Sequence, residues 1–121
     1  MMPDVPTQVT DSFGRIHRAS LNEYNVASAL AELELKFMFQ VEYFGGRRIR
    51  GGQVLDFLVY APFASPLQVY GEYWHEGQMA AEDSYKLSIL RVATGQEVDI
   101  IWGADSATFE DAMAAVQALY G

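Results

Sequence analysis

The sequence predicts one α/β domain, because helical and strand periodicities alternate along a chain that is long enough for a single hydrophobic core. The chain has 121 residues, of which 50% are hydrophobic, so a stable core can form without disulfide cross-links. It has no cysteine, which excludes disulfides and thiolate zinc sites. We expect a polar, extended arm over residues 1–19, and then the order helix, three strands, helix, strand, helix.

The first half of the domain is predicted to hold one helix and two strands. Ser20 and Glu23 form a capping box, and the apolar residues after them recur at helical spacing, which predicts a helix over about 21–34. Residues 36–44 are aromatic and β-branched and predict a strand. Residues 54–60 predict a second strand that is nearly apolar on both faces.

The second half is predicted to hold two strands and two helices. After a turn with two prolines, residues 67–71 predict a strand, and residues 80–93 have the spacing of a helix that ends at a glycine. Residues 97–102 predict a short strand. A last helix opens near Thr108, and its apolar stripe is typical of a core-facing helix, although it could also seat a partner protein.

The charge distribution limits the partners that the chain can bind. A net charge of −8 argues against a general nucleic-acid binder, which needs clustered lysines and arginines. Most of the excess is in residues 61–121, which hold nine acidic and two basic residues. Arg47, Arg48 and Arg50 lie together in a glycine-flanked loop. This loop is either a DNA-contacting element or a solvated turn.

Asp56 is the residue that most needs an explanation, because it lies inside an apolar strand. A buried carboxylate is costly unless it is hydrogen-bonded, paired with a cation or bound to a metal. Backbone amides or a nearby arginine could satisfy it without any function. The next predicted strand leads through Gly71 and two aromatic residues into His75. A histidine at that position, beside Asp56, is suited to carrying a proton.

These features together resemble the Vsr-like (very-short-patch-repair type) nucleases and the related EDxHD homing endonucleases. The resemblance lies in Gly-Gly-Gln-Val-Leu-Asp-Phe at 51–57, Val-Tyr-Gly-Glu-Tyr-Trp-His at 69–75, and Asp83 with Lys86 on a helix. It covers about residues 20–103. It implies the αβββαβ core of the restriction-endonuclease-like PD-(D/E)XK superfamily, with a mixed central sheet and a C-terminal helix, in a single domain over 20–121.

The resemblance also implies a site for Mg²⁺, which Mn²⁺ could replace. Asp56 and the main-chain carbonyl of Val69 would bind the metal, and His75 would be the general base that activates water. Glu23 would lie near the metal-bound waters, and Asp83 would be oriented toward the site. The DNA contacts that it implies are Arg47, Arg48, Arg50, Tyr73, Trp74 and Lys86.

Several of these roles have alternatives that the sequence leaves open. Glu23 already caps its helix, so Glu32 or Glu34 could supply the site carboxylate instead. Asp83 could simply favour the start of its helix, and Lys86 could pair with Asp83 rather than contact phosphate. Glu72 could add a ligand, and the aromatic residues could pack on the edge of the sheet.

The chain also departs from the resembled family. The structural zinc site of the repair enzymes cannot form without cysteines, Tyr70 replaces a second histidine, and Gly71 stands where the commoner nuclease motif has a lysine. These departures argue against mismatch repair itself. His17, the other histidine, lies in the polar arm without an evident partner.

We therefore expect a metal-dependent DNA endonuclease or nickase, and by analogy with the resembled family we expect a phage or a mobile element to encode it. Its small acidic surface suggests a homodimer or a protein partner that supplies DNA specificity. The alternative is a catalytically silent adaptor on the same fold, acting through protein–protein contacts. No apolar run approaches a membrane span and the N-terminus lacks the apolar core of a signal peptide, so a cytoplasmic location, in a bacterial or phage-infected cell, is expected.

Overall fold

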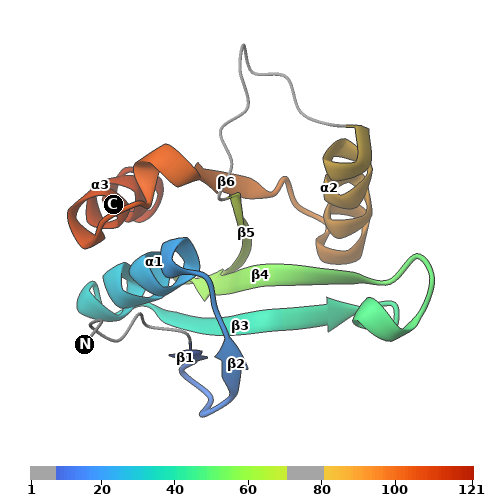
Figure 1. Cartoon of the computed structure of the whole chain (residues 1–121), viewed down its shortest axis with the longest axis horizontal. Coiled ribbons are helices and arrows are strands. Elements are labelled where there is room, and N and C mark those ends of the chain that lie inside the picture. Colours follow the sequence, from blue (N-terminus) through green and yellow to red (C-terminus); the bar gives the residue numbers. More distant parts are fainter. Residues whose placement is uncertain (1–7, 71–80) are drawn as a thin grey trace, which may run out of the picture.

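A four-stranded mixed sheet with three helices forms the body of the protein (Figure 1). The computed structural model describes residues 8–70 and 81–121. The strand order in the sheet is β3-β4-β5-β6. The elements are β1 (Gln8–Thr10), β2 (Ile16–Arg18), α1 (Leu21–Glu32), β3 (Lys36–Tyr43), η1 (Gly46–Arg48), β4 (Gln53–Tyr60), β5 (Ala64–Tyr70), α2 (Ala81–Thr94), β6 (Asp99–Trp102), η3 (Gly103–Asp105) and α3 (Phe109–Tyr120).

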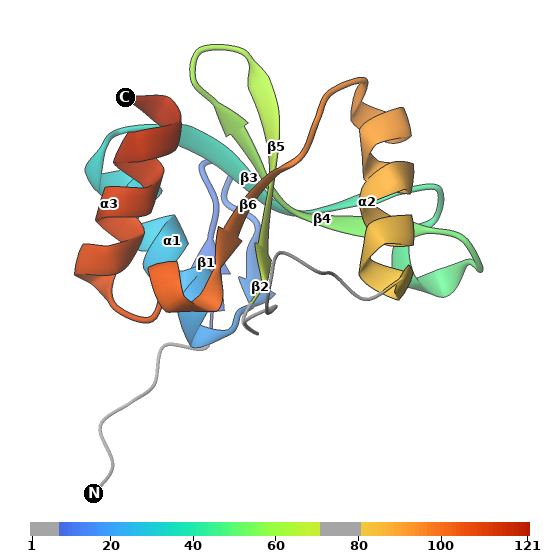
Figure 2. The same ribbon diagram turned by 90° about the horizontal axis from the view of Figure 1, so that it is seen from above.

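The predicted α/β class and the mixed sheet are confirmed. The pairings of β3 with β4 and of β4 with β5 are antiparallel, whereas β5 and β6 are parallel. A parallel pair needs a crossover connection, and α2 lies between β5 and β6 in the chain. Figure 2 shows α1 and α3 together on one side of β5 and β6, with α2 on the other side. No helix in residues 8–70 and 81–121 has both the length and the apolarity to cross a membrane.

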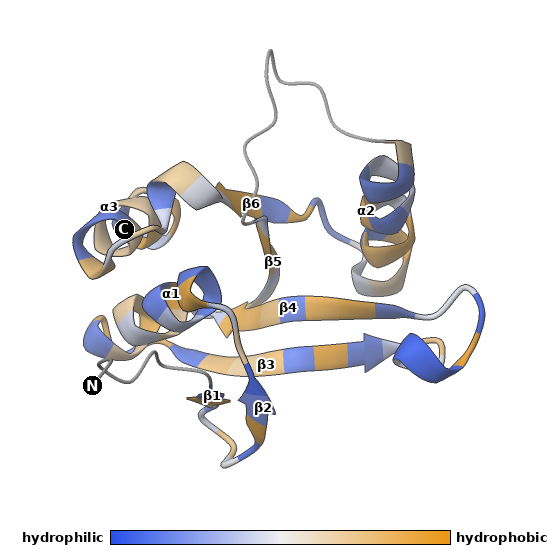
Figure 3. Cartoon of the chain, in the orientation of Figure 1, coloured by the Kyte–Doolittle hydropathy of each residue, from blue (hydrophilic) through white to orange (hydrophobic). Residues whose placement is uncertain are grey.

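The main hydrophobic core lies between the sheet and the pair of helices α1 and α3. Buried and half-buried residues alternate along β4, which is the pattern of a sheet with one strongly buried face. Hydrophilic residues interrupt β3, whereas β4 is hydrophobic over most of its length (Figure 3). In α3, Ala112 and Val116 are fully buried and Met113 packs against the core. These three residues of the apolar stripe therefore belong to the core, whereas Leu119 is 39% exposed. Of the largest fully buried apolar side chains, Phe39, Phe57, Leu30 and Leu67 belong to this core, whereas Leu55 and Leu90 lie outside it.

The arm expected over residues 1–19 contains a β-hairpin that packs on the body, which differs from the extended segment predicted. β1 and β2 pair in antiparallel fashion, and Val9 is 3% exposed. The turn between them caps the free edge of β3, where Phe37 N donates to Ser12 Oγ at 2.9 Å and Phe39 N donates to Asp11 Oδ2 at 3.1 Å. Such cover protects an edge strand. Strands of three residues are too short to give a periodic signal in the sequence.

Asp11 holds the hairpin together as well as capping β3. Its Oδ1 accepts hydrogen bonds from the backbone N–H groups of Phe13 and Arg15, both at 2.9 Å, and its carboxylate lies 3.6 Å from the Arg15 guanidinium. The Asp11 side chain is fully buried. Its removal would leave buried N–H groups without an acceptor, which is more costly than the loss of one exposed hydrogen bond.

We expect Asp11→Ala to lower the free energy of unfolding by about 2–4 kcal/mol, because three backbone donors and one guanidinium lose their partner together. Urea denaturation followed by circular dichroism measures this change. Asp105→Ala, at an exposed aspartate, is the matched control and should change it by less than about 0.5 kcal/mol. Equal effects of the two substitutions would contradict the structural role of Asp11.

Candidate functional site

Asp56 lies at a point where regular pairing stops between β4 and β3. The register places Gln40 opposite Asp56, but these two residues are not paired. The residues on either side of them do pair across the two strands. Gln40 has a φ of 57°, a left-handed conformation that costs a non-glycine residue roughly 1–2 kcal/mol. Its carbonyl accepts from Arg15 Nη2 at 3.0 Å and its side-chain Oε1 accepts from Arg47 Nη2 at 3.1 Å. Two arginines thus stabilise the distorted backbone opposite Asp56.

Pairing also stops between β4 and β5 at the same residue. The last ladder pair on this side joins Phe57 to Leu67. Beyond this pair, the side chains of Asp56 and Gln68 accept the hydrogen bonds of the backbone N–H groups, in place of the carbonyls of the neighbouring strand. Asp56 N donates to Gln68 Oε1 at 2.6 Å, and Val69 N donates to Asp56 Oδ2 at 2.8 Å. Val69, whose carbonyl the sequence resemblance implies as a metal ligand, thus lies beside Asp56.

A cleft of about 420 Å³ opens where the two ladders separate. Its lining includes three carboxylates from three different elements, namely Glu23 of α1, Asp56 of β4 and Asp83 of α2. Arg47 and Lys86 bring positive charge to the same cleft. Gln68, Val69 and Tyr70 of β5 form its floor together with residues of β4.

Burial and a second carboxylate keep the proton on Asp56. Desolvation is the larger cause and the negative charge of Glu23 adds to it, so that the pKa of Asp56 rises to about 8. A hydrogen bond between the Asp56 and Glu23 carboxyl groups raises the pKa further, whereas the Val69 N–H and the positive charge of Arg47 lower it. Two carboxyl groups so close together need a shared proton or a cation, so this pair is prepared to bind positive charge.

Glu23 combines the two roles that the sequence had left as alternatives. Its Oε1 accepts from Ser20 N at 2.8 Å, while Glu23 N donates to Ser20 Oγ at 3.1 Å, which completes the capping box. The same side chain reaches the cleft. Glu32 and Glu34 are exposed at the far end of α1 and do not line the cleft. Of these three candidates, Glu23 is the one that meets Asp56.

Asp83 and Lys86 both lie in the cleft wall formed by α2. Asp83 is in the first turn of the helix, where negative charge is favourable, and it also lines the cleft. Lys86 Nζ lies 3.8 Å from Glu82 Oε1. The ion pair of Lys86 is therefore with Glu82, and not with Asp83, which the sequence analysis had offered as its partner. This pair is largely exposed, and such pairs contribute little to stability. Lys86 therefore remains available for a ligand in the cleft.

The predicted DNA contacts separate into three groups. Arg47 lines the cleft, whereas Arg48 and Arg50 are exposed on the same loop without lining it. Lys86 lines the cleft from the other side. The remaining predicted site residues, Tyr73, Trp74 and His75, lie outside the described residues, as does Glu72.

Gln40 and Gln68 are two site residues that the sequence analysis missed. Both are buried, and both lie at the level of Asp56 in the strands next to β4. The signal for Gln68 was a polar residue between the apolar Leu67 and Val69, the same pattern that drew attention to Asp56. Tyr70 also lines the cleft and packs against Trp102, with ring centroids 5.6 Å apart.

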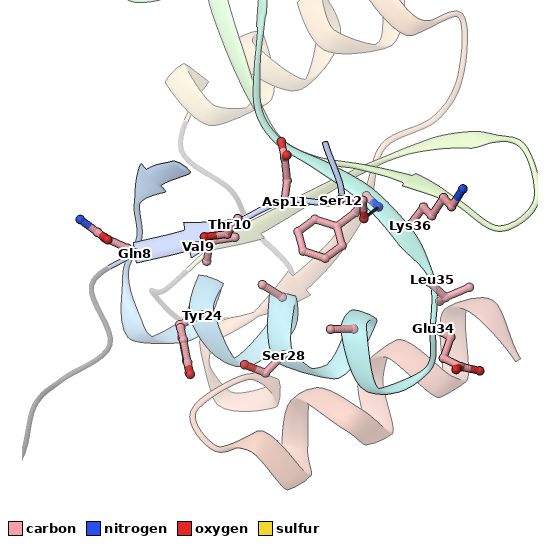
Figure 4. A pocket seen from close by; sticks show the side chains of 13 residues that line it. Gln8, Val9, Thr10, Asp11, Ser12, Tyr24, Ser28, Glu34, Leu35 and Lys36 are labelled. Carbon is pink, nitrogen blue, oxygen red and sulfur yellow. Dashed lines mark hydrogen bonds between the residues drawn. The ribbon is translucent and has the colours of Figure 1, made fainter. Parts of the chain in front are cut away.

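A larger hollow of about 550 Å³ lies elsewhere, between β1, α1 and the start of β3 (Figure 4). Of its acidic side chains, Asp11 is engaged with the backbone and points away from α1, and Glu34 is exposed at the rim. None of the predicted catalytic residues within the described chain lines it. Size alone therefore does not mark the candidate site, whereas the convergence of charged groups at Asp56 does.

Comparisons with family models, with curated proteins and with solved structures find no match to this chain. Within residues 8–70 and 81–121, no three His, Cys, Asp or Glu side chains meet closely enough to make a metal site by themselves. Magnesium differs from zinc in this respect, because it is usually held by one or two carboxylates and several waters.

The raised pKa of Asp56 predicts a stability that falls with rising pH. Between the unfolded pKa of about 3.9 and the folded pKa of about 8, the folded chain holds a proton that the unfolded chain has lost, so stability decreases across this window. Asp56→Asn keeps an acceptor for the Val69 N–H and removes the titration. We expect it to be roughly 1–3 kcal/mol more stable than wild type at pH 8 and about equal at pH 4.

Urea denaturation of wild type and Asp56→Asn at several pH values between 4 and 9 measures this difference. Asp105→Asn, at an exposed aspartate, serves as the control for general charge effects. A difference between wild type and Asp56→Asn that stays constant over this pH range would contradict the assignment.

Proposed function

We propose that the chain is a metal-dependent DNA endonuclease or nickase with a restriction-endonuclease-like fold. The observation that carries this proposal is the interruption of both ladders at Asp56, where Glu23 meets Asp56 in a cleft that Asp83, Arg47 and Lys86 also line. Hydrolysis of a phosphodiester needs a bound cation, a proton acceptor and positive charge for the phosphate. A cleft with both carboxylates and cations suits these three needs.

The order of elements supports the proposed fold. From α1 to β6 the chain runs α1-β3-β4-β5-α2-β6, which is the αβββαβ order that the sequence resemblance implies. The sheet is mixed, as that core requires, and α3 is the expected C-terminal helix. The β1–β2 hairpin is an addition before this core. Asp56 lies on β4 and Val69 on β5, and the resemblance assigns metal binding to these two residues.

The oxygen donors around Asp56 fit a hard divalent cation. The Asp56 carboxyl, the Glu23 carboxyl and the Val69 carbonyl are all oxygen ligands, which Mg²⁺ and Mn²⁺ prefer. A cation here would replace the proton that Asp56 and Glu23 share. When bound, it would supply charge neutralisation for the phosphate and for the leaving oxygen.

The chain's own residues would divide the remaining work. Asp56 is held in place by the Val69 N–H, and a cation that displaced the proton shared with Glu23 would bind the Asp56 carboxylate in this position. Glu23 would orient the attacking water, and Arg47 and Lys86 would bind the phosphate oxygens. In this proposal His75 takes the proton from the water, which a group with a pKa near 6.5 can do at neutral pH. A second subunit or a partner protein would provide further DNA contacts.

We expect wild-type protein to nick supercoiled plasmid in Mg²⁺ or Mn²⁺ and to be inactive in EDTA. Asp56→Ala and His75→Ala should each lower the nicking rate by at least about 10²-fold, because one removes a metal ligand and the other the general base. Glu97→Ala, on the exposed loop after α2, is the matched control and should retain activity. Nicking that survives in Asp56→Ala would contradict this assignment of the site.

Metal binding can be tested without any cleavage. We expect Mn²⁺ to raise the melting temperature of the wild type, and to do so more at pH 8 than at pH 5, because the metal competes with the proton on Asp56. Asp56→Asn should abolish this shift. Differential scanning fluorimetry measures it, and an equal shift in both proteins would place the metal elsewhere.

A further inference from the structure

A second hollow adjoins the cleft on the side of the β1–β2 hairpin. It has a volume of about 520 Å³ and is formed by β2, the start of α1, β3 and η1. The side chains that matter for its chemistry are His17, Arg18, Ser20, Glu23, Gln40 and Arg47. Glu23 and Arg47 line this hollow and the Asp56 cleft alike. The two hollows therefore meet at Glu23 and Arg47, and together they are called the groove below.

The cations of this groove are suited to a phosphate diester. Arg18 and Arg47 are exposed, and neither forms an ion pair within residues 8–70 and 81–121. By contrast, Arg15 is paired with Asp11 and Arg91 with Glu97. A guanidinium offers two parallel donors that match two phosphate oxygens. An acidic chain thus carries two arginines along one groove that have no carboxylate partner within the described residues, although Arg47 donates to the Gln40 side chain.

His17 contributes a neutral donor to the same hollow. Its Nε2 lies 3.1 Å from Arg15 Nη2, and a guanidinium can only donate, so Nε2 accepts and the ring proton is on Nδ1. The ring packs against Phe39 in a T-shaped arrangement, with centroids 6.3 Å apart. Arg15 and Phe39 thus fix the ring in one tautomer and orientation, which leaves Nδ1–H as the donor for a ligand.

We propose that the hollow between β2 and α1 binds the DNA phosphate next to the one at Asp56 on the same strand, through Arg18, His17 and Arg47. This inference rests on the proposed function, because it takes the phosphate at Asp56 to be the scissile one. The hairpin is then a substrate-binding element placed beside the αβββαβ core. Arg47, which lines both hollows, would contact oxygens of both phosphates.

The test is DNA binding in EDTA, where cleavage cannot proceed, measured by fluorescence anisotropy with a labelled single strand and the matching duplex over a range of salt concentrations. We expect Arg18→Ala to weaken binding roughly tenfold and to reduce the salt slope by about one. His17→Ala should weaken it roughly threefold, because a neutral donor contributes one hydrogen bond. Arg91→Ala, which removes an exposed arginine paired with Glu97, is the control for net charge and should change affinity less than about twofold.

Each outcome separates the inference from the function on which it rests. If Arg18→Ala and Arg91→Ala weaken binding equally, the phosphate subsite is wrong even if the wild type cuts DNA. Binding that depends on Arg18, in a protein that does not nick plasmid with metal, supports the groove and contradicts only the cutting activity. If the wild type binds neither DNA at low salt, both proposals fail. Melting temperatures of Arg18→Ala and His17→Ala close to that of the wild type exclude unfolding as the cause.

Discussion

The hydrogen bond from the Val69 N–H to the Asp56 carboxyl organises the centre of this protein. It forms where β4 and β5 stop pairing through their backbones, and the Gln68 side chain completes the exchange by accepting from Asp56 N. Side chains thus replace ladder bonds at one level of the sheet. The buried polar groups remain satisfied, and the strands separate enough to leave a cleft between them. A regular ladder at this level would fill that space with backbone.

The same arrangement makes Asp56 costly to ionise. It is desolvated and faces Glu23, and a single N–H and the charge of Arg47 do not offset these two effects. Groups with strongly perturbed pKa values are concentrated at functional sites, because such sites place ionisable groups where little water is present to stabilise their charge. The stability lost at neutral pH is a local cost that the core beneath the sheet can absorb. A divalent cation would remove the cost, which links metal binding to stability.

The N-terminal hairpin connects to this centre through Arg15. This arginine contacts Asp11 and His17 in the hairpin and the Gln40 carbonyl in β3. Gln40, in its left-handed conformation, in turn accepts from Arg47 at the cleft. A chain of hydrogen bonds therefore runs from the hairpin to the cleft. Residues of the segment that was predicted as a polar arm thus help to hold the strained strand opposite Asp56.

The sequence by itself determined the α/β class, the order of the predicted elements and the importance of Asp56. Periodicity and capping signals are local, so Ser20 and Glu23 could be identified as a capping box from spacing alone. A carboxylate in an apolar strand is visible in any sequence. Only the tertiary structure decided that Glu23 rather than Glu32 or Glu34 meets Asp56, that Gln40 and Gln68 support it, and that the hairpin carrying His17 lies beside the cleft. These facts depend on contacts between residues far apart in the chain, and such contacts leave no periodic signal in a single sequence.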